Sequence, residues 1–316
     1  MIATDLDFAS ADGHSRSHAL LREPDDVATP SFRPRAVVQL VHGMAEHAAR
    51  YEPFAEFLVS HGFVVCCNDH VGHGRTAASP EELGHMPLKE GEEVLLGDVR
   101  QLRRTVTERY PDAPYVIFGH SMGSFVTRTY LTREGAGVAA AVICGTGQQS
   151  RLLSAAGRIV PTLIARVRGE RYRSAFVDSL GAGGYASKVK GAETPDDWIT
   201  ADRAVVDAFQ ADELCGQKFS VGAYVTLSSL VADATSGRLA RQVPKGLPML
   251  FVAGDGDPVG DFGRGVRRAA DEYRSAGVRD VELVLYPNVR HEILNEPACR
   301  GQVMADVLDF LTRQGL

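Results

Sequence analysis

Ser121 lies in the segment Gly119-His120-Ser121-Met122-Gly123, which directly follows the apolar run at residues 115–118. A nucleophilic serine is often found on a sharp turn between a strand and a helix, where small flanking residues let the chain bend and expose the serine oxygen. The pentapeptide alone is a weak signal, because such a serine can instead cap the following helix. The apolar run before it and the amphipathic segment after it favour Ser121 as a nucleophile.

A serine hydroxyl becomes a good nucleophile only when a neighbouring base removes its proton. With this kind of turn, the acid and then the histidine follow the serine in the chain. Of the ten histidines, only His291 follows Ser121, and it comes just after the apolar run at residues 281–287. We predict that His291 is the general base, and the alternative is a surface histidine near a helix start.

Two aspartates compete for the role of the acid that orients the histidine. Asp255 and Asp257 both follow the apolar run at residues 247–254. Asp257 precedes Pro258, which favours an extended backbone that can aim the carboxylate across the site. Asp255 is nearer to the end of the expected strand and could instead shape the turn. We therefore predict Asp257 as the acid.

Acyl transfer places negative charge on a carbonyl oxygen, and backbone amides aimed at that oxygen stabilise it. One such amide should belong to Met122, the residue after the nucleophile. The second should come from the loop at residues 42–45, where we select the amide of Met44. His42 lies in the same loop, but it precedes Ser121, so we expect it to support the loop.

The segments that must position these residues alternate between strands and helices. Residues up to about 23 read as an antiparallel hairpin. After it, strands are expected at residues 36–43, 63–70, 115–121, 138–145, 247–254 and 281–287, and helices at 50–62, 91–110, 122–135, 262–276 and 298–311. This alternation predicts an α/β fold, a mostly parallel sheet with helices on both faces.

The alternation stops at residues 148–244, where mostly helical segments contain no clear buried strand. We predict a core made of residues 1–147 and 245–316, with a helical cap inserted at 148–244. Ligands of open α/β sheets bind at the carboxyl ends of the strands, which such a cap would cover.

One segment of this insertion, residues 152–173, combines apolar residues with five arginines. It could lie on an anionic membrane surface, or it could pack its apolar side over the pocket while the arginines face water. The apolar side chains of three other insertion residues, Trp198, Phe209 and Tyr224, could line an acyl site or pack within the cap.

The composition narrows the function classes. The chain has 316 residues and is 44% hydrophobic. Its net charge is −6, so it lacks the positive charge expected of a protein that binds nucleic acid. Five scattered cysteines without paired spacing suit a reducing compartment. The first residues lack the pattern of a signal peptide, and no window approaches the ~18 apolar residues of a membrane span. We therefore expect a cytoplasmic protein.

The ordered set of motifs resembles the monoacylglycerol lipase and lysophospholipase branch of the α/β-hydrolases. These motifs are His42-Gly43-Met44-Ala45-Glu46-His47 with Arg50-Tyr51, Asp69-His70-Val71-Gly72-His73-Gly74, the Ser121 pentapeptide, and His291-Glu292-Ile293-Leu294-Asn295-Glu296. The resemblance covers the core from about residue 37 to the end. It implies a capped serine hydrolase that cleaves carboxylic esters of single-chain lipids, with no cofactor and no metal ligand.

Carried over to this chain, the resemblance implies Ser121 as nucleophile, Asp257 as acid, His291 as base, and the amides of Met44 and Met122 as oxyanion donors. The chain departs from the family pattern at Ala45 and Ser124, where glycine is common, and at Met44, where a small residue is common. An acyltransferase or a peptidase could use the same triad. A non-catalytic binding protein of this fold would be expected to lack a triad member.

Overall fold

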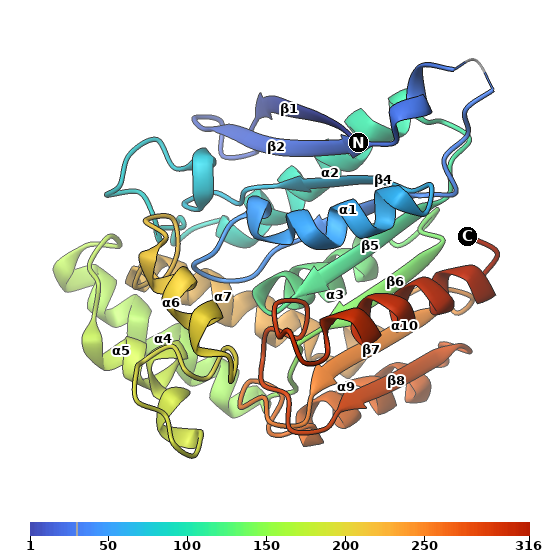
Figure 1. Ribbon diagram of the computed structural model, residues 1–316. Helices are drawn as coiled ribbons and strands as arrows, with labels where there is room; N and C mark the ends of the chain where they lie inside the picture. The colour runs from blue at the N-terminus through green and yellow to red at the C-terminus, as the bar shows by residue number, and fades with distance from the viewer. Residues whose placement is uncertain (30) are drawn as a thin grey trace.

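The computed structural model describes residues 1–29 and 31–316, and its centre is a sheet of eight strands in the order β1-β2-β4-β3-β5-β6-β7-β8 (Figure 1). The strands are β1 (Ile2–Ala9), β2 (Arg16–Glu23), β3 (Val37–Val41), β4 (Val64–Asn68), β5 (Tyr115–His120), β6 (Ala140–Cys144), β7 (Met249–Gly254) and β8 (Val281–Tyr286). The pairs β1–β2 and β2–β4 are antiparallel, and the other neighbouring strands are parallel. The predicted mostly parallel sheet is confirmed.

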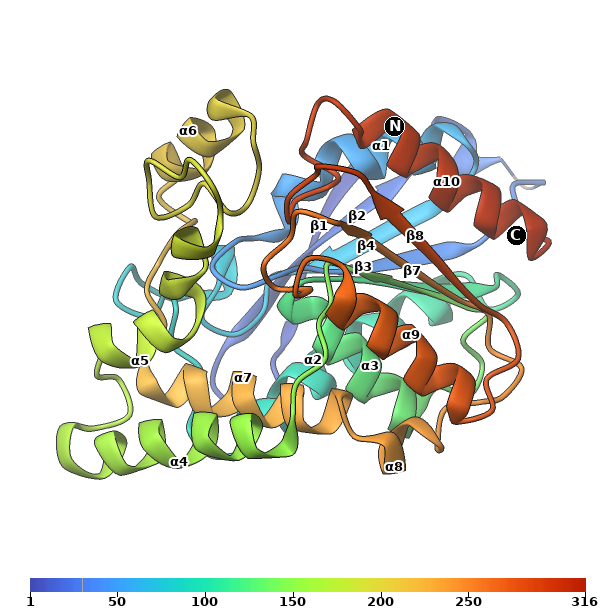
Figure 2. The ribbon, with the colours of Figure 1, turned by 90° about the horizontal axis from the view of Figure 1, so that it is seen from below.

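Helices cover both faces of this sheet (Figure 2). One face carries α1 (Glu52–Ser60) and α10 (Arg300–Arg313), and the other carries α2 (Gly91–Arg109), α3 (Met122–Glu134) and α9 (Arg264–Ser275). The strands from β3 to β7 are buried along their whole length. This double coverage explains why their sequences are continuous apolar runs instead of alternating patterns.

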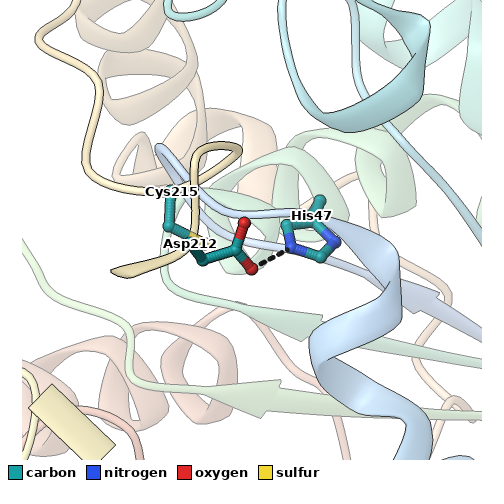
Figure 3. Close-up of side chains that lie close together, drawn as sticks. All are labelled: His47, Asp212 and Cys215. Carbon is teal, nitrogen blue, oxygen red and sulfur yellow. Dashed lines mark hydrogen bonds and ion pairs between the residues drawn. The ribbon is translucent and has the colours of Figure 1, made fainter. Parts of the chain in front are cut away.

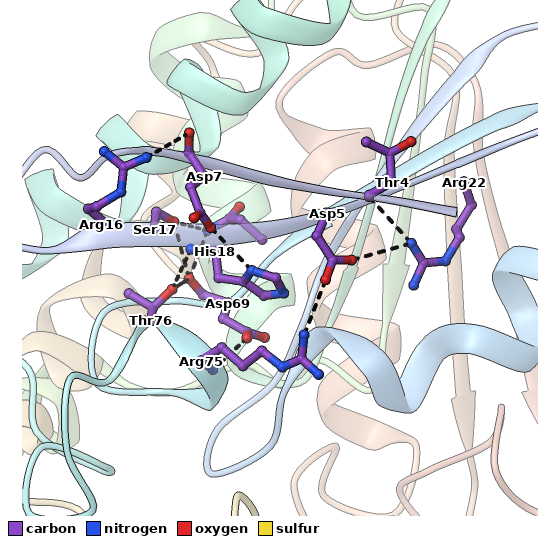
Figure 4. A network of polar contacts seen from close by, with 11 residues as sticks. Thr4, Asp5, Asp7, Arg16, Ser17, His18, Arg22, Asp69, Arg75 and Thr76 are labelled. Atoms are coloured by element: carbon purple, nitrogen blue, oxygen red, sulfur yellow. Dashed lines mark hydrogen bonds and ion pairs between the residues drawn. The ribbon is translucent and has the colours of Figure 1, made fainter. Parts of the chain in front are cut away.

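The β1–β2 hairpin is attached to the core by polar contacts around η3 (Gly74–Thr76), which Figure 4 shows. The His18 amide donates to the Thr76 hydroxyl at 2.9 Å, and the Ser17 hydroxyl donates to the Asp69 carbonyl oxygen at 3.3 Å. Arg75 forms an ion pair with Asp5 at 3.2 Å. The hairpin is therefore fixed beside the loop that follows β4.

The insertion between β6 and β7, residues 148–244, is called the cap from here on. It contains α4 (Arg151–Arg168), α5 (Ala175–Leu180), α6 (Arg203–Ala211), α7 (Val221–Ala234) and α8 (Gly237–Ala240), with the short turns η4 (Ala182–Gly184) and η5 (Ala186–Lys188). Helices α4 and α7 lie side by side beyond one end of the sheet (Figures 1 and 2).

Two cap segments reach the loops that follow strands β3 and β8. The Gly216 amide donates to the Ala45 carbonyl oxygen at 2.9 Å, and the Glu292 amide donates to the Ile199 carbonyl oxygen at 2.7 Å. The cap therefore lies over the carboxyl ends of the strands, where ligands bind in open α/β sheets.

Two further short turns complete the fold, η1 (Asp25–Ala28) after the hairpin and η2 (Ala48–Tyr51) before α1. Throughout residues 1–29 and 31–316, the helices are too short or too polar to cross a membrane.

Candidate active site

Ser121 lies on the tight turn between β5 and α3. Its backbone has φ 53° and ψ −121°, an unfavourable conformation for a residue with a side chain. A Cβ atom at Gly123 would overlap the Val41 carbonyl oxygen, and one at Gly119 would overlap the Thr127 hydroxyl. No side chain fits at these two glycines, so the turn can bring β5, β3 and α3 close together and leave Ser121 partly exposed.

His291 and Asp257, the predicted base and acid, are hydrogen-bonded to each other. His291 Nδ1 lies 2.8 Å from Asp257 Oδ2, and both side chains are buried. Asp257 Oδ1 accepts the amide of Val259 at 2.8 Å, which fixes the carboxylate. Because Nδ1 donates to the carboxylate, Nε2 is the nitrogen left to accept a proton.

The imidazole of His291 lies at the end of β6, next to the turn between β5 and α3 that carries Ser121. Ser121 donates its amide to the Cys144 carbonyl oxygen at 3.0 Å, and a Cβ atom on the next residue, Gly145, would lie 3.0 Å from His291 Cε1. Among the described residues, the buried Nε2 of His291 has no hydrogen-bond partner. Bonds between a nucleophile and its base are often unformed before substrate binds, so this arrangement fits a base ready to act.

The surroundings of His291 control its protonation. Burial opposes the positive charge, but the negative charge of Asp257 and its hydrogen bond outweigh burial and raise the pKa of His291 above its usual value. Glu292 and Glu46 also favour the protonated form. The imidazole can therefore accept a proton from a hydroxyl and hold it while bonds are rearranged.

Asp255, the competing acid, has a different partner. Its Oδ1 accepts the amide of Asn288 at 2.6 Å, which ties the end of β7 to the loop that leads to His291. Its own amide donates to the Tyr286 carbonyl oxygen at 3.0 Å. Asp257, and not Asp255, is thus the carboxylate paired with the imidazole.

The loop after β3 lies directly against Ser121, the predicted nucleophile. A Cβ atom at Gly43 would be 3.0 Å from the Ser121 Cβ. The Gly43 amide already donates to Glu46 Oε1 at 2.5 Å, so it is not available to a substrate. The amide of Met44 is the next donor along the loop. Met122 is the first residue of α3, where amides have no acceptor within the helix.

His42 connects this loop to the loop after β4. Its Nδ1 donates to the Gly43 carbonyl oxygen at 2.8 Å, and its Nε2 accepts the His70 amide at 3.0 Å. Burial, together with the neighbouring His70 and His73, holds the pKa of His42 well below its usual value. A neutral imidazole with both nitrogens occupied supports the loop, as expected from its position in the sequence.

Comparison with known proteins identifies the family. Residues 33–298 match the family model described as serine aminopeptidase, S33. A monoacylglycerol lipase of Mycolicibacterium smegmatis is 32% identical over 90% of this chain and 91% of its own length. The monoglyceride lipase of Mus musculus is 25% identical over 90% of this chain and 85% of its own length. The chain belongs to the serine aminopeptidase S33 family of α/β-hydrolases.

Solved structures agree with this assignment. A thermostable carboxyl esterase from Bacillus coagulans superposes on all of this chain with a TM-score of 0.91 at 30% identity and full coverage of both chains. A lipase in an open form gives a TM-score of 0.89 at 30% identity, with 99% of each chain covered. The resemblance to the monoacylglycerol lipase branch is confirmed, and this α/β-hydrolase is a carboxylic ester hydrolase.

A buried charged cluster connects the two loops of the hydrolase site. Arg50 donates to Glu46 Oε2 at 3.0 Å and to both carboxylate oxygens of Glu292, at 2.6 and 2.7 Å. Burial favours neutral Glu292, but the charge of Arg50 prevails and lowers the pKa of Glu292 to about 2. Burial raises the pKa of Glu46 despite the attraction of Arg50. The sequence motifs contain all three residues, but charged residues are usually expected at the surface, so their shared burial was not predicted.

The cap contributes aromatic side chains to this hydrolase site. The Trp198 ring lies 4.9 Å from the His291 ring, measured between centroids. Phe209 lies under the Arg50 guanidinium at 4.8 Å, and Tyr224 donates its hydroxyl to Asp178 at 2.7 Å. Trp198 is therefore the one of the three that lies against the predicted base, whereas Phe209 and Tyr224 have contacts within the cap or with Arg50.

Proposed function

We propose that this hydrolase cleaves the ester bond of single-chain lipids, such as monoacylglycerols or lysophospholipids, through an acyl-enzyme on Ser121. The observation that carries the proposal is the buried Asp257–His291 pair beside the strained Ser121 turn. In this proposal, Asp257 orients the imidazole and His291 takes the serine proton. The amides of Met44 and Met122 stabilise the oxyanion.

The reaction would proceed in two halves. Ser121 Oγ attacks the ester carbonyl carbon while His291 Nε2 takes the hydroxyl proton, and the carbonyl oxygen becomes an oxyanion. When that intermediate collapses, the bond to the alcohol breaks, and His291 gives its proton to the leaving oxygen. Water then attacks the acyl-enzyme with His291 again as base, which releases the fatty acid and restores Ser121.

The substrate class is supported by the relatives and by the cap. The relatives from Mycolicibacterium smegmatis and Mus musculus are a monoacylglycerol lipase and a monoglyceride lipase. We propose residues 148–244 as a cap domain over a core of residues 1–147 and 245–316. A covered site with Trp198 against the base suits one acyl chain better than three.

We also propose that the cap touches lipid surfaces through α4 and α5. Helix α4 packs against α7, yet the apolar side chains along its other side face solvent: Leu152, Leu153, Ile159, Leu163 and Val167, continued on α5 by Phe176 and Leu180. Leu152 and Val167 are 84% and 82% exposed. Exposed arginines at 158, 166 and 168 accompany this surface, as in helices that lie on anionic membranes.

The acyl-enzyme is tested with a fluorophosphonate probe, which should label wild type once and leave Ser121→Ala unmodified. Ser124→Ala serves as the matched control, because Ser124 lies close by, in the first turn of α3, and donates its hydroxyl to the Ser121 carbonyl oxygen at 2.6 Å. Labelling of another serine in Ser121→Ala would overturn the assignment of the nucleophile.

Substrate class is tested with monoacylglycerol, lysophospholipid and triacylglycerol of matched acyl length. We expect faster turnover of the monoacyl esters, and faster turnover of the triacyl substrate would contradict a single-chain site. An aminoacyl amide and an added alcohol acceptor, assayed beside them, distinguish the peptidase and acyltransferase alternatives.

Membrane contact is tested by co-sedimentation with vesicles. Wild type should bind anionic vesicles more strongly than zwitterionic ones, and Leu163→Glu with Val167→Glu should weaken binding. Ile2→Glu, an exposed apolar position on β1, should leave binding unchanged. Equal binding by the α4 variant and wild type would contradict contact through this helix.

A further inference from the structure

Three potential metal ligands lie together where the cap meets the loop that carries Met44. They are His47, Asp212 and Cys215, and their ligand atoms all lie within 4.8 Å of one another (Figure 3). His47 Nε2 donates to Asp212 Oδ2 at 2.8 Å. His47 and Cys215 are buried, and Asp212 is partly buried. Imidazole, carboxylate and thiolate are the three protein ligand types that zinc prefers.

The backbone around these residues is held independently of any ligand. Leu214 donates its amide to Asp212 Oδ1 at 2.9 Å, and Cys215 donates its amide to the Asp212 carbonyl oxygen at 3.0 Å. Gly216 donates to the Ala45 carbonyl oxygen at 2.9 Å, which fixes the cap segment against the loop that precedes His47. Such preorganisation is what a metal site requires.

A cavity of about 300 Å³ opens beside the cluster, and of the three ligands only His47 lines it, next to Leu214. Its other walls include Asp5, His18, Arg22 and Arg75 of the network in Figure 4. A zinc site with three protein ligands keeps its fourth position for water. The cavity would supply both that water and a route for the ion to enter.

We propose that His47, Asp212 and Cys215 form a binding site for a zinc-class divalent ion that joins the cap to the loop after β3. Tetrahedral zinc places its ligand atoms about 3.3–3.7 Å apart, so the His47–Asp212 pair opens slightly and Cys215 moves inward. On binding, the Cys215 thiol releases its proton to solvent. The His47 proton moves from Nε2 to Nδ1, and Asp212 binds through Oδ2.

Sequence analysis misses the site because His47 is far along the chain from the other two ligands, Asp212 and Cys215. His47 and Asp212 are separated by 165 positions, so no short ligand spacing marks them. The His47–Asp212 hydrogen bond alone would be a structural contact between cap and core. A thiol added to that pair is what makes the cluster a metal site.

Cobalt(II) and zinc(II) test the proposal on the whole enzyme without reference to catalysis. Cobalt should bind once per chain and give an absorption band from a thiolate ligand. Zinc should raise the thermal midpoint of wild type, because an ion that binds only the folded state stabilises it. Neither readout depends on hydrolysis, so failure of the proposed function would not affect them.

Variants inside and outside the cluster distinguish metal binding at this site from metal binding by other thiols and imidazoles. Cys215→Ser should abolish the thiolate band and weaken zinc binding by at least about tenfold, and His47→Gln should weaken binding similarly. Cys299→Ser and His61→Gln are matched controls outside the cluster and should bind like wild type. Each variant's metal-free thermal midpoint shows whether it folds. A thiolate band that survives in Cys215→Ser, or no binding by folded wild type, would overturn the site.

Discussion

The core side and the cap side of the active site are built in different ways. On the core side, Ser121, His291 and Asp257 are fixed by buried hydrogen bonds and a strained turn. On the cap side, Trp198 packs against the base through its ring, and α4 leaves apolar side chains in solvent. In the proposed mechanism, the chemistry therefore depends on directional contacts, whereas substrate fit depends on packing that tolerates change.

Arg50, which is partly buried, and Arg128, which is fully buried, illustrate the same difference between the core side and the cap side. Arg50 contacts the carboxylates of Glu46 and Glu292, beside the loops that hold Met44 and His291. Arg128 donates to neutral groups where the cap begins and where α7 ends, namely the Gly147 and Ala234 carbonyl oxygens at 2.8 Å, the Gln148 side chain and the Thr146 hydroxyl. Arg50 therefore fixes the site, and Arg128 fixes the cap to α3.

The largest effect is expected where the core side holds the imidazole. Asp257→Asn favours the wrong tautomer of His291 and should lower kcat several powers of ten, as an equivalent change does by about ten-thousandfold in serine proteases. Asp255→Asn is the control, because Asp255 binds the Asn288 amide, and it should lower mainly the thermal midpoint. If Asp255→Asn is the inactive and well-folded variant, the assignment of Asp257 is wrong.

Substitution of Arg50 should lower both activity and stability, whereas substitution of Arg128 should lower stability alone. Arg50→Met removes the cationic partner of two buried carboxylates and should destabilise the fold by about 3–5 kcal/mol. It should also lower kcat about a hundredfold, since small displacements of reacting groups have effects of this size. Arg128→Met should lower the thermal midpoint and leave the kcat of the folded enzyme close to wild type. If both variants lose the same factor in kcat, Arg50 and Arg128 have the same effect on the active site, and the distinction between them is wrong.

The pH dependence of kcat/KM reports the charge around His291. The base must be neutral to accept the serine proton, and its pKa is raised, so activity should fall as pH decreases through a value above about 6.5. Glu292→Gln removes a negative charge that raises this pKa and should move the acid limb to lower pH. A limb that moves to higher pH in this variant would contradict the electrostatic account.

The smallest effect is expected in the loop after β3, where Ala45 has φ 52°. Ala45→Gly should stabilise the fold by about 0.5–1 kcal/mol. Holding a residue with a side chain in the left-handed region costs about 1–2 kcal/mol of folding free energy, which glycine avoids. The added freedom of glycine in the unfolded chain offsets about 0.4–1 kcal/mol of this gain. Ala49→Gly, in η2, should instead destabilise. Urea unfolding of both variants measures the difference, and a destabilised Ala45→Gly would show that the alanine methyl group contributes packing.

The sequence alone predicted which segments form the strands of the sheet, and it selected Ser121 as the candidate nucleophile. Apolar runs identify buried parallel strands, and glycines around Ser121 identify a turn that admits nothing larger. The prediction of the strands is confirmed, because a buried strand is marked by neighbours along the chain. The choice of His291 also needed only chain order, since no other histidine follows Ser121.

Only the tertiary structure decided which polar groups meet. It paired Asp257 with His291, occupied the Gly43 amide with Glu46 and thereby left Met44 as the next donor. It also brought Arg50 between two buried carboxylates. The contact between Arg50 and Glu292 joins segments 242 residues apart, so no local pattern could predict it. The stability of such contacts comes from burial in a low-dielectric interior, which exists only after the sheet and the cap have packed.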